Sequence, residues 1–394
     1  MPSVIKRIQE YNKDISGELL QMKMEALLES PFRFYRGTCH LFAEDFQKAY
    51  SAKAKVTTWI CADLHFENFG SYKGQNRLVY FDINDFDESF LGIPEVDLAR
   101  FLTSIIIAGR QMRAKAKDIH DTLIMLADAY VANLHAGKAL MMEHEVAHDK
   151  LKKYFDELLS RDRDAFIAKR TEKKKTGLVI KTDGVMSKPI TASRKKQVFA
   201  ALNRLLKSNK HFADLELKDA AFRIAGTGSL GLQRYEVLCY SKKRGKYYFL
   251  DIKEARRSCY THITKIKQPR FANEAERTLY AGWVMQFCTP GYMQTLEIDN
   301  KWYVVKELQP TIDKMAIEGF GNDFKSLRES ALEMAPLIAY AHIRSSGHKG
   351  ASTADGLIKF SEKHKWKNDI IELSGDMADK NDKYYHTYLS SKHK

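Results

Sequence analysis

The longest stretch without a helix breaker constrains the fold most. No proline occurs between Pro94 and Pro189, and apolar residues there recur at helical spacing, as in VDLARFLTSIIIAGRQM and IHDTLIMLADAYVANLHAGKALM. This stretch therefore predicts a helical body. Residues 1–30 are interpreted as one or two helices that end at Pro31, followed by a short irregular piece and a helix within PFRFYRGTCHLFAEDF.

A cluster of strands follows the helical body. AFRIAGTGSLGLQRYEVLCY leads through the turn SKKRG into KYYFLDIKEA, and YMQTLEI and KWYVVKEL form a hairpin that turns at Asp299–Asn300. A helix in FANEAERTLYAGWVMQF separates the two strand groups, and further helices close the chain. The sequence predicts an α+β fold in three parts: a helical lobe at 1–210, a β-rich lobe at 211–310 and C-terminal helices at 311–394.

The charge balance favours anionic partners. Lys and Arg total 64 against 50 Asp and Glu, which gives a formal net charge of +14. The segment 150–210 contains KRTEKKKTGLVIKTDGVMSKPITASRKK, which we interpret as an exposed insertion. It could bind an anionic ligand or a membrane surface, and a solvated charged surface is the alternative. No nucleic-acid-binding motif is recognised, and the oligomeric state is not predicted.

The sequence has no feature typical of a membrane or disulfide-bonded protein. No apolar run approaches the roughly 20 residues of a membrane span, and the N-terminus lacks the apolar core and cleavage site of a signal peptide. The cysteines are odd in number and scattered, which indicates neither a disulfide framework nor a zinc site: Cys39, Cys61, Cys239, Cys259 and Cys288. A cytoplasmic location is expected, and delivery into another cell as an effector stays open.

Two polar segments follow apolar strands and carry the residues for phosphoryl-transfer chemistry. KVTTWIC runs into CADLHFENFG, which contains Asp63 and Asn68, and NRLVYFDI ends in NDFDES, so that Asp82, Asp85 and Asp87 lie nearby. Carboxylates packed together repel each other unless a cation or protons compensate, which predicts a divalent metal. Phosphoryl transfer needs a carboxylate for the acceptor hydroxyl and oxygen ligands for magnesium. An acidic turn with helix-capping residues is the alternative.

The first of these segments resembles the catalytic loop of protein kinases and, more closely, of aminoglycoside and choline kinase-like phosphotransferases. Those families carry His-x-Asp-x-x-x-x-Asn; Asp63 and Asn68 match, and Cys61 stands where the His is expected. NDFDESFLGIPEVDLAR resembles their second segment, in which a metal-binding Asp-Phe precedes Gly-x-Pro-x-x-Asp-Leu. The matching residues are Asp85, Phe86, Gly92, Pro94, Asp97 and Leu98.

This resemblance implies a role for each acid. Asp63 would be the catalytic base, and Asn68 would be a magnesium ligand together with Asp85, which the spacing favours over Asp82. Asp97 would support the catalytic loop, although an acid in the first turn of a helix is the alternative. The remaining supporting residues are expected to be His65, which shapes the loop, and Asp87.

The residues that hold ATP are expected downstream of the catalytic loop. GTGSLG lies between two predicted strands, as the phosphate-covering loop of a kinase does, and a plain hairpin turn is the alternative. In YYFLDIKEA, strand alternation places Asp251, where kinases have a small residue, on the same face as Lys253. Lys253 is expected to bind phosphate and to be oriented by Glu276, which is preferred to Glu274. The predicted loop contacts are Gly226, Thr227, Gly228, Ser229 and Gly231.

The motif order resembles an uncharacterised bacterial family with kinase-like motifs in circularly permuted order, which also carries PFRFYRG and AYAHIRSSG. It implies a bilobal, permuted kinase-like fold and a magnesium-dependent ATP phosphotransferase. A small-molecule or lipid acceptor is favoured over protein, because no long activation segment separates Asp85 from Pro94. Transfer of AMP by the same fold and a pseudokinase or anion-binding module are the alternatives. Arg36 and Arg344 are expected to form structural ion pairs, and contact with phosphate or with acidic loop residues is the alternative.

Overall fold

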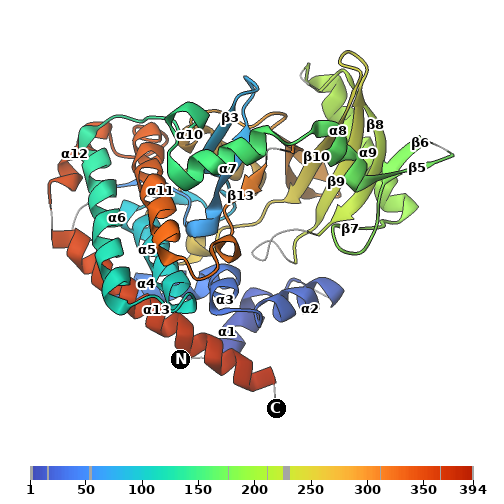
Figure 1. Ribbon diagram of the computed structural model, residues 1–394. Helices are drawn as coiled ribbons and strands as arrows, with labels where there is room; N and C mark the ends of the chain where they lie inside the picture. The colour runs from blue at the N-terminus through green and yellow to red at the C-terminus, as the bar shows by residue number, and fades with distance from the viewer. Residues whose placement is uncertain are drawn as a thin grey trace.

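The structure is a computed structural model that describes residues 3–15, 17–52, 56–175, 177–210, 212–224, 231–310, 312–363 and 365–392. Over these ranges the chain is a mixed α+β protein, as the sequence predicts. Figure 1 shows a helical body beside a twisted sheet with its own flanking helices. The helical body and the sheet face each other, and chain segments from both lie along this boundary.

The helical body is built around α5 (Pro94–Gln111), which is buried along most of its length. A proline in its first turn, followed by Glu95 and Asp97, favours the start of the helix. Helices α6, α11 and α13 pack against α5, and apolar side chains from all four belong to the main core cluster. The other helices of the body are α3 Pro31–Gly37, α4 Cys39–Ala49, α6 Ala116–Ala136, α7 Asp149–Leu159, α11 Phe324–Arg344, α12 Ala354–Ser361 and α13 Lys365–Lys392.

The large sheet is antiparallel, with the spatial order β11-β12-β10-β9-β8-β7. Its strands are β7 Ser187–Lys188, β8 Leu215–Arg223, β9 Arg234–Ser241, β10 Lys246–Glu254, β11 Gln294–Ile298 and β12 Lys301–Leu308. The hairpin predicted at Asp299–Asn300 is confirmed, and the positive φ of both turn residues, 50° and 60°, suits a tight hairpin. One sheet face packs on α9 (Ala192–Ser208), through Val198 and Leu202.

Flanking helices and short strands connect the large sheet to the helical body. Helix α8 (Arg163–Arg170) packs against the sheet through Ile167, and α10 (Glu274–Met285) contacts β11 and β12 as well as α11. The short strands are β1 Thr58–Ile60, β2 Phe69–Lys73, β3 Val79–Ile83, β4 Phe90–Gly92 and β13 Asp313–Lys314. Because β1 pairs with β4 and β2 with β3, the segments 61–68 and 84–89 are brought together.

Helices α1 (Val4–Tyr11) and α2 (Gly17–Ala26) form an N-terminal arm. The apolar face of α1 packs against α13 and α4, where Ile8 lies in one cluster with Tyr388. Helix α2 extends toward the sheet, and Glu18 contacts Lys188 of β7. Figure 1 shows both helices along the lower edge of the molecule. The arm therefore touches both parts of the chain.

Several segments differ from the sequence prediction. The expected irregular piece after Pro31 is helix α3, because Ser30 caps it by accepting the N–H of Arg33 at 3.1 Å. The basic stretch forms the hairpin β5 (Thr171–Lys174) and β6 (Gly177–Ile180) and then β7. These strands are only two to four residues long and show little alternation, which hides them from pattern analysis. Strand β7 and helix α9, which precede the expected boundary at residue 211, pack with the large sheet.

The hairpin β5–β6 carries exposed lysines, among them Lys173 and Lys174, and projects from the sheet in Figure 1. Its binding to an anionic ligand or membrane surface stays a prediction. Among the helices in the described ranges, none has an apolar stretch long enough to cross a bilayer.

Candidate active site

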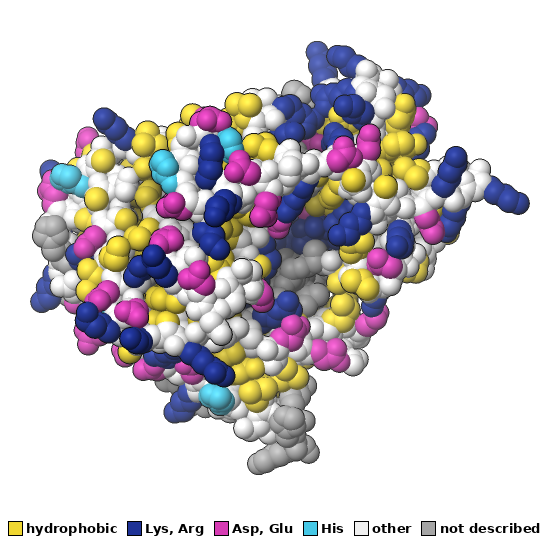
Figure 2. Space-filling view, viewed as in Figure 1, with side chains coloured by type: hydrophobic (Ala, Val, Ile, Leu, Met, Phe, Trp, Pro, Cys, Tyr) yellow, Lys and Arg dark blue, Asp and Glu magenta, His cyan; other side chains and the backbone are white. Residues whose placement is uncertain are grey.

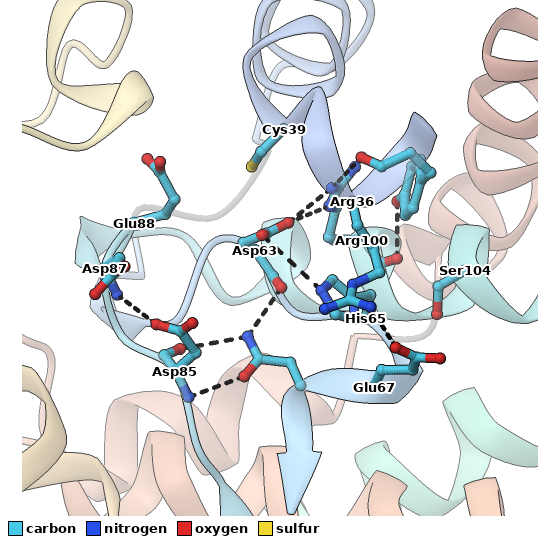
Figure 3. A network of polar contacts seen from close by, with 12 residues as sticks. Arg36, Cys39, Asp63, His65, Glu67, Asp85, Asp87, Glu88, Arg100 and Ser104 are labelled. Atoms are coloured by element: carbon cyan, nitrogen blue, oxygen red, sulfur yellow. Dashed lines mark hydrogen bonds and ion pairs between the residues drawn. The ribbon is translucent and has the colours of Figure 1, made fainter. Parts of the chain in front are cut away.

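One face of α5 holds the loop that follows β1. Asp97, Arg100 and Ser104 occupy positions i, i+3 and i+7, which lie on one side of a helix. All three are completely buried, and each binds a different point of the loop. Ser104 Oγ accepts the N–H of Phe66 at 3.0 Å, which secures the end of the loop. Figure 3 shows Arg100 and Ser104 beside the loop that carries Asp63.

Asp97 holds the backbone where β1 ends. Its carboxylate accepts the N–H groups of Cys61 at 2.9 Å and Ala62 at 2.7 Å, and Nε2 of His342 lies 3.2 Å away. Ala62 has a φ of 68°, a left-handed conformation that costs roughly 1–2 kcal/mol for a residue with a side chain. The hydrogen bonds to Asp97 therefore stabilise a strained turn immediately before Asp63, in the place that the resemblance implies for Asp97.

Asp63 is bound on one side by Arg100. Nε and Nη2 of Arg100 donate to Oδ1 of Asp63 at 3.1 and 2.7 Å, and Oδ2 lies 4.0 Å from Nε2 of His65. The Asp63 side chain is 20% exposed, so it stays accessible. Burial raises the pKa of Asp63 to about 6, although Arg100 acts in the opposite direction. A carboxyl group with a pKa near neutrality is suited to exchange protons with a hydroxyl group.

Asn68 connects the loop to the acidic segment after β3. Its Oδ1 accepts the N–H of Asp85 at 2.9 Å, and its Nδ2 donates to the carbonyl oxygens of Asp63 and Asp85 at 3.0 and 3.3 Å. Nδ2 also lies 3.1 Å from the sulfur of Cys61. An amide oxygen with one hydrogen bond keeps a lone pair that can bind a cation.

Lys253 reaches the acidic segment from β10. Its Nζ lies 2.9 Å from Asp85 and 2.5 Å from Asp87. Burial acts to lower the pKa of Lys253, but the two carboxylates outweigh it and raise the pKa. Burial acts to raise the pKa of Asp85, which Lys253 nevertheless holds low; the pKa of Asp87 is raised by burial and by the Asp85 charge. The two acids thus share one ammonium group.

Asp82 lies apart from this cluster and forms a structural ion pair. It is 2% exposed, and Arg344 Nη2 lies 2.8 Å from its Oδ2. Asp82 also accepts the N–H groups of Ile83 and Phe287, at 2.9 and 3.2 Å. Both oxygens of Asp82 therefore have partners in the fold, whereas Asp85 is the acid whose backbone N–H binds Asn68.

The polar residues between Asp63 and Asn68 shape the loop. Glu67 contacts Arg36 and Lys314 and accepts the N–H of Ile317 at 3.0 Å, which ties the loop to the segment after β13. The ring of His65 is buried at the edge of the Phe32 ring, and burial lowers its pKa well below the ordinary value. A neutral His65 therefore supports the loop by packing.

The prediction that Glu276 orients Lys253 is wrong. Glu276 caps its own helix instead: its carboxylate accepts the N–H of Ala272 at 3.1 Å, and its N–H donates to Asn273 at 2.9 Å. Glu274 pairs with Arg277 at 2.6 Å. Both glutamates lie in the first turn of α10, where the free N–H groups of the helix attract carboxylates.

The predicted glycine loop is described only in part. Gly226, Thr227, Gly228 and Ser229 lie outside the described residues. Gly231 has a φ of 100°, and a Cβ there would lie 2.5 Å from Cδ1 of Ile15. A larger residue would be strained by this φ and would require the Ile15 side chain to shift, at the point where the N-terminal arm approaches β9.

Two cavities meet at Asp63. The sheet cavity, about 300 Å³, lies between the loop and the large sheet and is lined by Arg223, Arg234, Asp251, Lys306 and Leu308. The arm cavity, about 70 Å³, lies between the loop and the N-terminal arm and is lined by Tyr11, Lys23, Cys39, Glu88 and Arg256. Both also include Arg36, Asn68 and Asp85. Figure 2 shows Lys and Arg side chains around the hollow between the helical body and the sheet.

Charged side chains line the sheet cavity. Arg223 and Arg234 lie 2.9 and 2.6 Å from the carboxylate of Asp251, which is 1% exposed. Burial acts to raise the pKa of Asp251, but the two guanidinium groups hold it far below the ordinary value. Burial lowers the pKa of Lys306, which shares the cavity. The cavity thus offers several cations to a bound ligand.

Sequence reasoning missed Arg100. A signal was present, because Asp97 and Arg100 are two charged residues at helical spacing within the apolar stretch VDLARFLTSIII. Lys23 and Arg256 were also missed, since each stands alone in its segment. Only the tertiary structure brings those two residues to one cavity.

The fold and the site define a mixed α+β protein with a candidate active site between a helical body and a sheet. The chain belongs to the family described as "Uncharacterized protein conserved in bacteria (DUF2252)", whose model matches residues 16–391. That range includes all the site residues named above except Tyr11 and Ile15. No match was found among the curated proteins or the solved structures.

Proposed function

We propose that this protein is a magnesium-dependent ATP phosphotransferase that acts on a hydroxyl acceptor. The observation that carries the proposal is the convergence of Asp63, Asn68, Asp85 and Lys253. These residues come from three separate segments, and hydrogen bonds or an ion pair connect Asn68 to Asp63 and Asp85, and Asp85 to Lys253. A base, oxygen ligands and a phosphate-binding lysine are the parts that phosphoryl transfer needs.

Asp63 would orient and deprotonate the acceptor. Arg100 occupies Oδ1, so Oδ2 is the oxygen that can accept the proton of the hydroxyl group. In phosphoryl transfer, the acceptor oxygen then bonds to the γ-phosphorus while the bond to the β-phosphate oxygen breaks and ADP leaves.

The acidic segment fits a magnesium ion that is shared with phosphates. Within the described ranges, no group of three or more His, Cys, Asp or Glu side chains is arranged to hold a metal. Magnesium does not need such a group, because it is usually bound by one or two carboxylates, substrate phosphates and water. Asn68 and Asp85 would hold it, and the ion would neutralise phosphate charge. Lys253, now paired with Asp85 and Asp87, would bind a phosphate.

The element order supports a circularly permuted kinase-like fold. In a kinase, two strands joined by a glycine loop precede the strand with the lysine, a helix and further strands. Here β8, β9, β10, α10, β11 and β12 follow in this order, but after the loop that carries Asp63. The chain then returns through β13, which pairs with β2 beside that loop.

Transfer of AMP is a second candidate, favoured by the cations of the sheet cavity. Adenine pockets are predominantly apolar, whereas Arg side chains are well suited to bind phosphate. A triphosphate bound by Arg223, Arg234 and Lys306 would reverse the nucleotide relative to a kinase. The acceptor oxygen would then bond to the α-phosphorus, and pyrophosphate would leave.

Labelled ATP distinguishes the candidates. The full-length protein is incubated with magnesium and ATP labelled at either the γ or the α position, together with a pool of small bacterial metabolites. Transfer of γ label that is absent in Asp63→Asn supports the phosphotransferase, and transfer of α label supports AMP transfer. A protein that binds no magnesium–ATP in calorimetry would contradict both and favour an anion-binding module.

A further inference from the structure

The arm cavity contains two cations that have no carboxylate partner among the described residues. Lys23, on α2, is only 5% exposed, and its Nζ lies 5.9 Å from the centre of the Tyr11 ring. Arg256 is half-buried in the segment after β10. Across the described residues, neither side chain has a carboxylate within ion-pair distance or donates a hydrogen bond. Two positive charges in one cavity with no carboxylate partner indicate that the cavity can bind an anionic ligand.

The carboxylates of the arm cavity are already engaged. Its three aspartates are held by Arg100 and Lys253, as described above. Glu88 accepts the O–H of Tyr11 at 3.2 Å and the N–H of Cys259 at 2.6 Å. These acids therefore do not neutralise the two cations by direct contact.

Burial makes the isolated position of Lys23 costly. Burial lowers the pKa of Lys23 to about 8, and the charge of Arg256 acts in the same direction, while Glu88, Asp63 and Cys39 act against it. The Tyr11 ring compensates only weakly for the hydration that this ammonium group loses on burial. An anion bound between Lys23 and Arg256 would compensate this cost.

We propose that the arm cavity binds an anionic group of the acceptor, carboxylate or phosphate, through Lys23 and Arg256. The inference rests on the proposed phosphotransfer at Asp63, which lines the same cavity, and it narrows the acceptor to a hydroxyl compound that carries negative charge. The nucleotide would occupy the larger sheet cavity on the other side of the loop.

The size of the arm cavity favours a small acceptor. Its volume of about 70 Å³ exceeds the roughly 10–15 Å³ that one water needs. It is well below the roughly 300–1,000 Å³ of sites for drug-sized ligands. A small hydroxy acid or phosphorylated polyol therefore fits this small cavity better than a lipid or a protein side chain.

Anion titrations of the full-length protein test this site. Inorganic phosphate and, as a carboxylate probe, acetate are titrated calorimetrically, with and without saturating magnesium and the ATP analogue adenylyl imidodiphosphate. Lys23→Met and Arg256→Met remove a charge but keep much of the apolar stem, and Lys23→Arg keeps the charge. Lys13→Met, at an exposed lysine of the same arm, is the matched control. Thermal melting verifies that each variant is folded.

We expect Lys23→Met and Arg256→Met each to weaken phosphate or acetate binding about tenfold or more, because a charge-assisted contact is lost. Lys13→Met and the affinity for the ATP analogue should change less than twofold, and Lys23→Arg should retain anion binding. Unchanged anion binding in Lys23→Met, no anion binding in the wild type, or an equal loss of analogue affinity would overturn the inference. If the wild type binds no magnesium–analogue, the phosphotransferase proposal fails, while the titration without nucleotide still decides the anion site.

Discussion

Arg100 donates two hydrogen bonds to a single oxygen of Asp63, from Nε at 3.1 Å and from Nη2 at 2.7 Å. The guanidinium group of Arg100 is completely buried, and its central carbon lies 3.5 Å from the centre of the Tyr35 ring. Nη2 also donates a hydrogen bond to the backbone carbonyl oxygen of Tyr35 at 2.8 Å. This arrangement orients Asp63 and leaves its Oδ2 for the acceptor. Arg100 on the buried helix α5 thus fixes the position of Asp63 in the loop after β1.

Arg100→Met should destabilise the protein by about 3–5 kcal/mol, because it leaves the mostly buried Asp63 carboxylate without its partner. Urea unfolding measures this change. Arg110→Met is a matched control on the same helix: Arg110 is 40% exposed and pairs with Asp379 and Asp382, so a loss below about 1 kcal/mol is expected. In the double variant with Asp63→Asn, the losses should not add. Additive losses would show that the two residues do not stabilise each other.

Asp97→Asn should weaken magnesium–ATP binding. The N–H groups of Cys61 and Ala62 bind different oxygens of Asp97, and asparagine replaces one of these oxygens with an NH2 group that cannot accept. The left-handed turn at Ala62 then loses support. Adding Ala62→Gly should recover part of the affinity, because glycine adopts a φ near 68° without steric cost. Ala62→Gly alone should have little effect on binding. Calorimetry compares the four proteins, and an equal effect of glycine in both backgrounds would argue against this coupling.

Asp82 and Asp85 should differ in what they contribute. Asp85→Asn should remove the magnesium dependence of ATP binding while the melting temperature changes little. Asp82→Asn breaks the buried pair with Arg344, so it should destabilise the fold by about 3 kcal/mol while the folded protein still binds magnesium–ATP. Calorimetry at low temperature and thermal melting separate these effects. Loss of the magnesium dependence in Asp82→Asn instead would move the metal site to Asp82.

Local patterns were sufficient to predict where the acids and Lys253 lie. Asp63 and Asn68 were predicted because they follow a buried strand, and strand alternation in β10 placed Lys253 on the same face as Asp251. In the structure this face lies opposite α9. The pairing of β1 with β4 and of β2 with β3 was not predictable in this way, because it depends on contacts distant in sequence. The sequence therefore indicated which segments carry the candidate site residues better than how the fold brings those segments together.

The partners of the charged residues were harder to predict. The rotation of α10 about its axis depends on how the helix packs, and its first-turn glutamates have local partners at the helix end. Asp82 and Asp85 could not be separated with certainty from their spacing, since their roles depend on Arg344 and Asn68 from distant segments. Ion pairs and hydrogen bonds between distant segments can be assigned only when the positions of both segments in the fold are known.

Glu276→Gln should change the affinity for magnesium–ATP less than twofold. Glutamine can still accept the N–H of Ala272, and Lys253 keeps its contacts with Asp85 and Asp87. Lys253→Met should weaken the affinity about tenfold or more, because a charge-assisted contact to phosphate is lost. Calorimetry on both variants makes the comparison. A loss in Glu276→Gln as large as that in Lys253→Met would restore the kinase-like pair of lysine and helix glutamate.

Glu95 should make the stability of the protein depend on pH. It is 2% exposed, and Tyr50 donates to it at 3.2 Å. Burial raises the pKa of Glu95 to about 7, although the hydrogen bonds act in the opposite direction. The pKa of Glu95 is therefore higher in the folded protein than in the unfolded chain. Glu95 makes its full contribution to the stability of the fold below a pH of about 4.5, and this contribution is lost as the pH rises to about 7.

Glu95→Gln removes this titration while it keeps the shape of the side chain. The free energy of unfolding of the variant, relative to the wild type, should therefore increase between pH 5 and pH 8, by at most about 3 kcal/mol. Urea unfolding at several pH values measures the difference, and the same substitution at the exposed Glu297 provides the control. A difference between Glu95→Gln and the wild type that stays constant over this range would show that Glu95 is ionised in the folded protein throughout, because the Tyr50 hydrogen bond and residual hydration outweigh its burial.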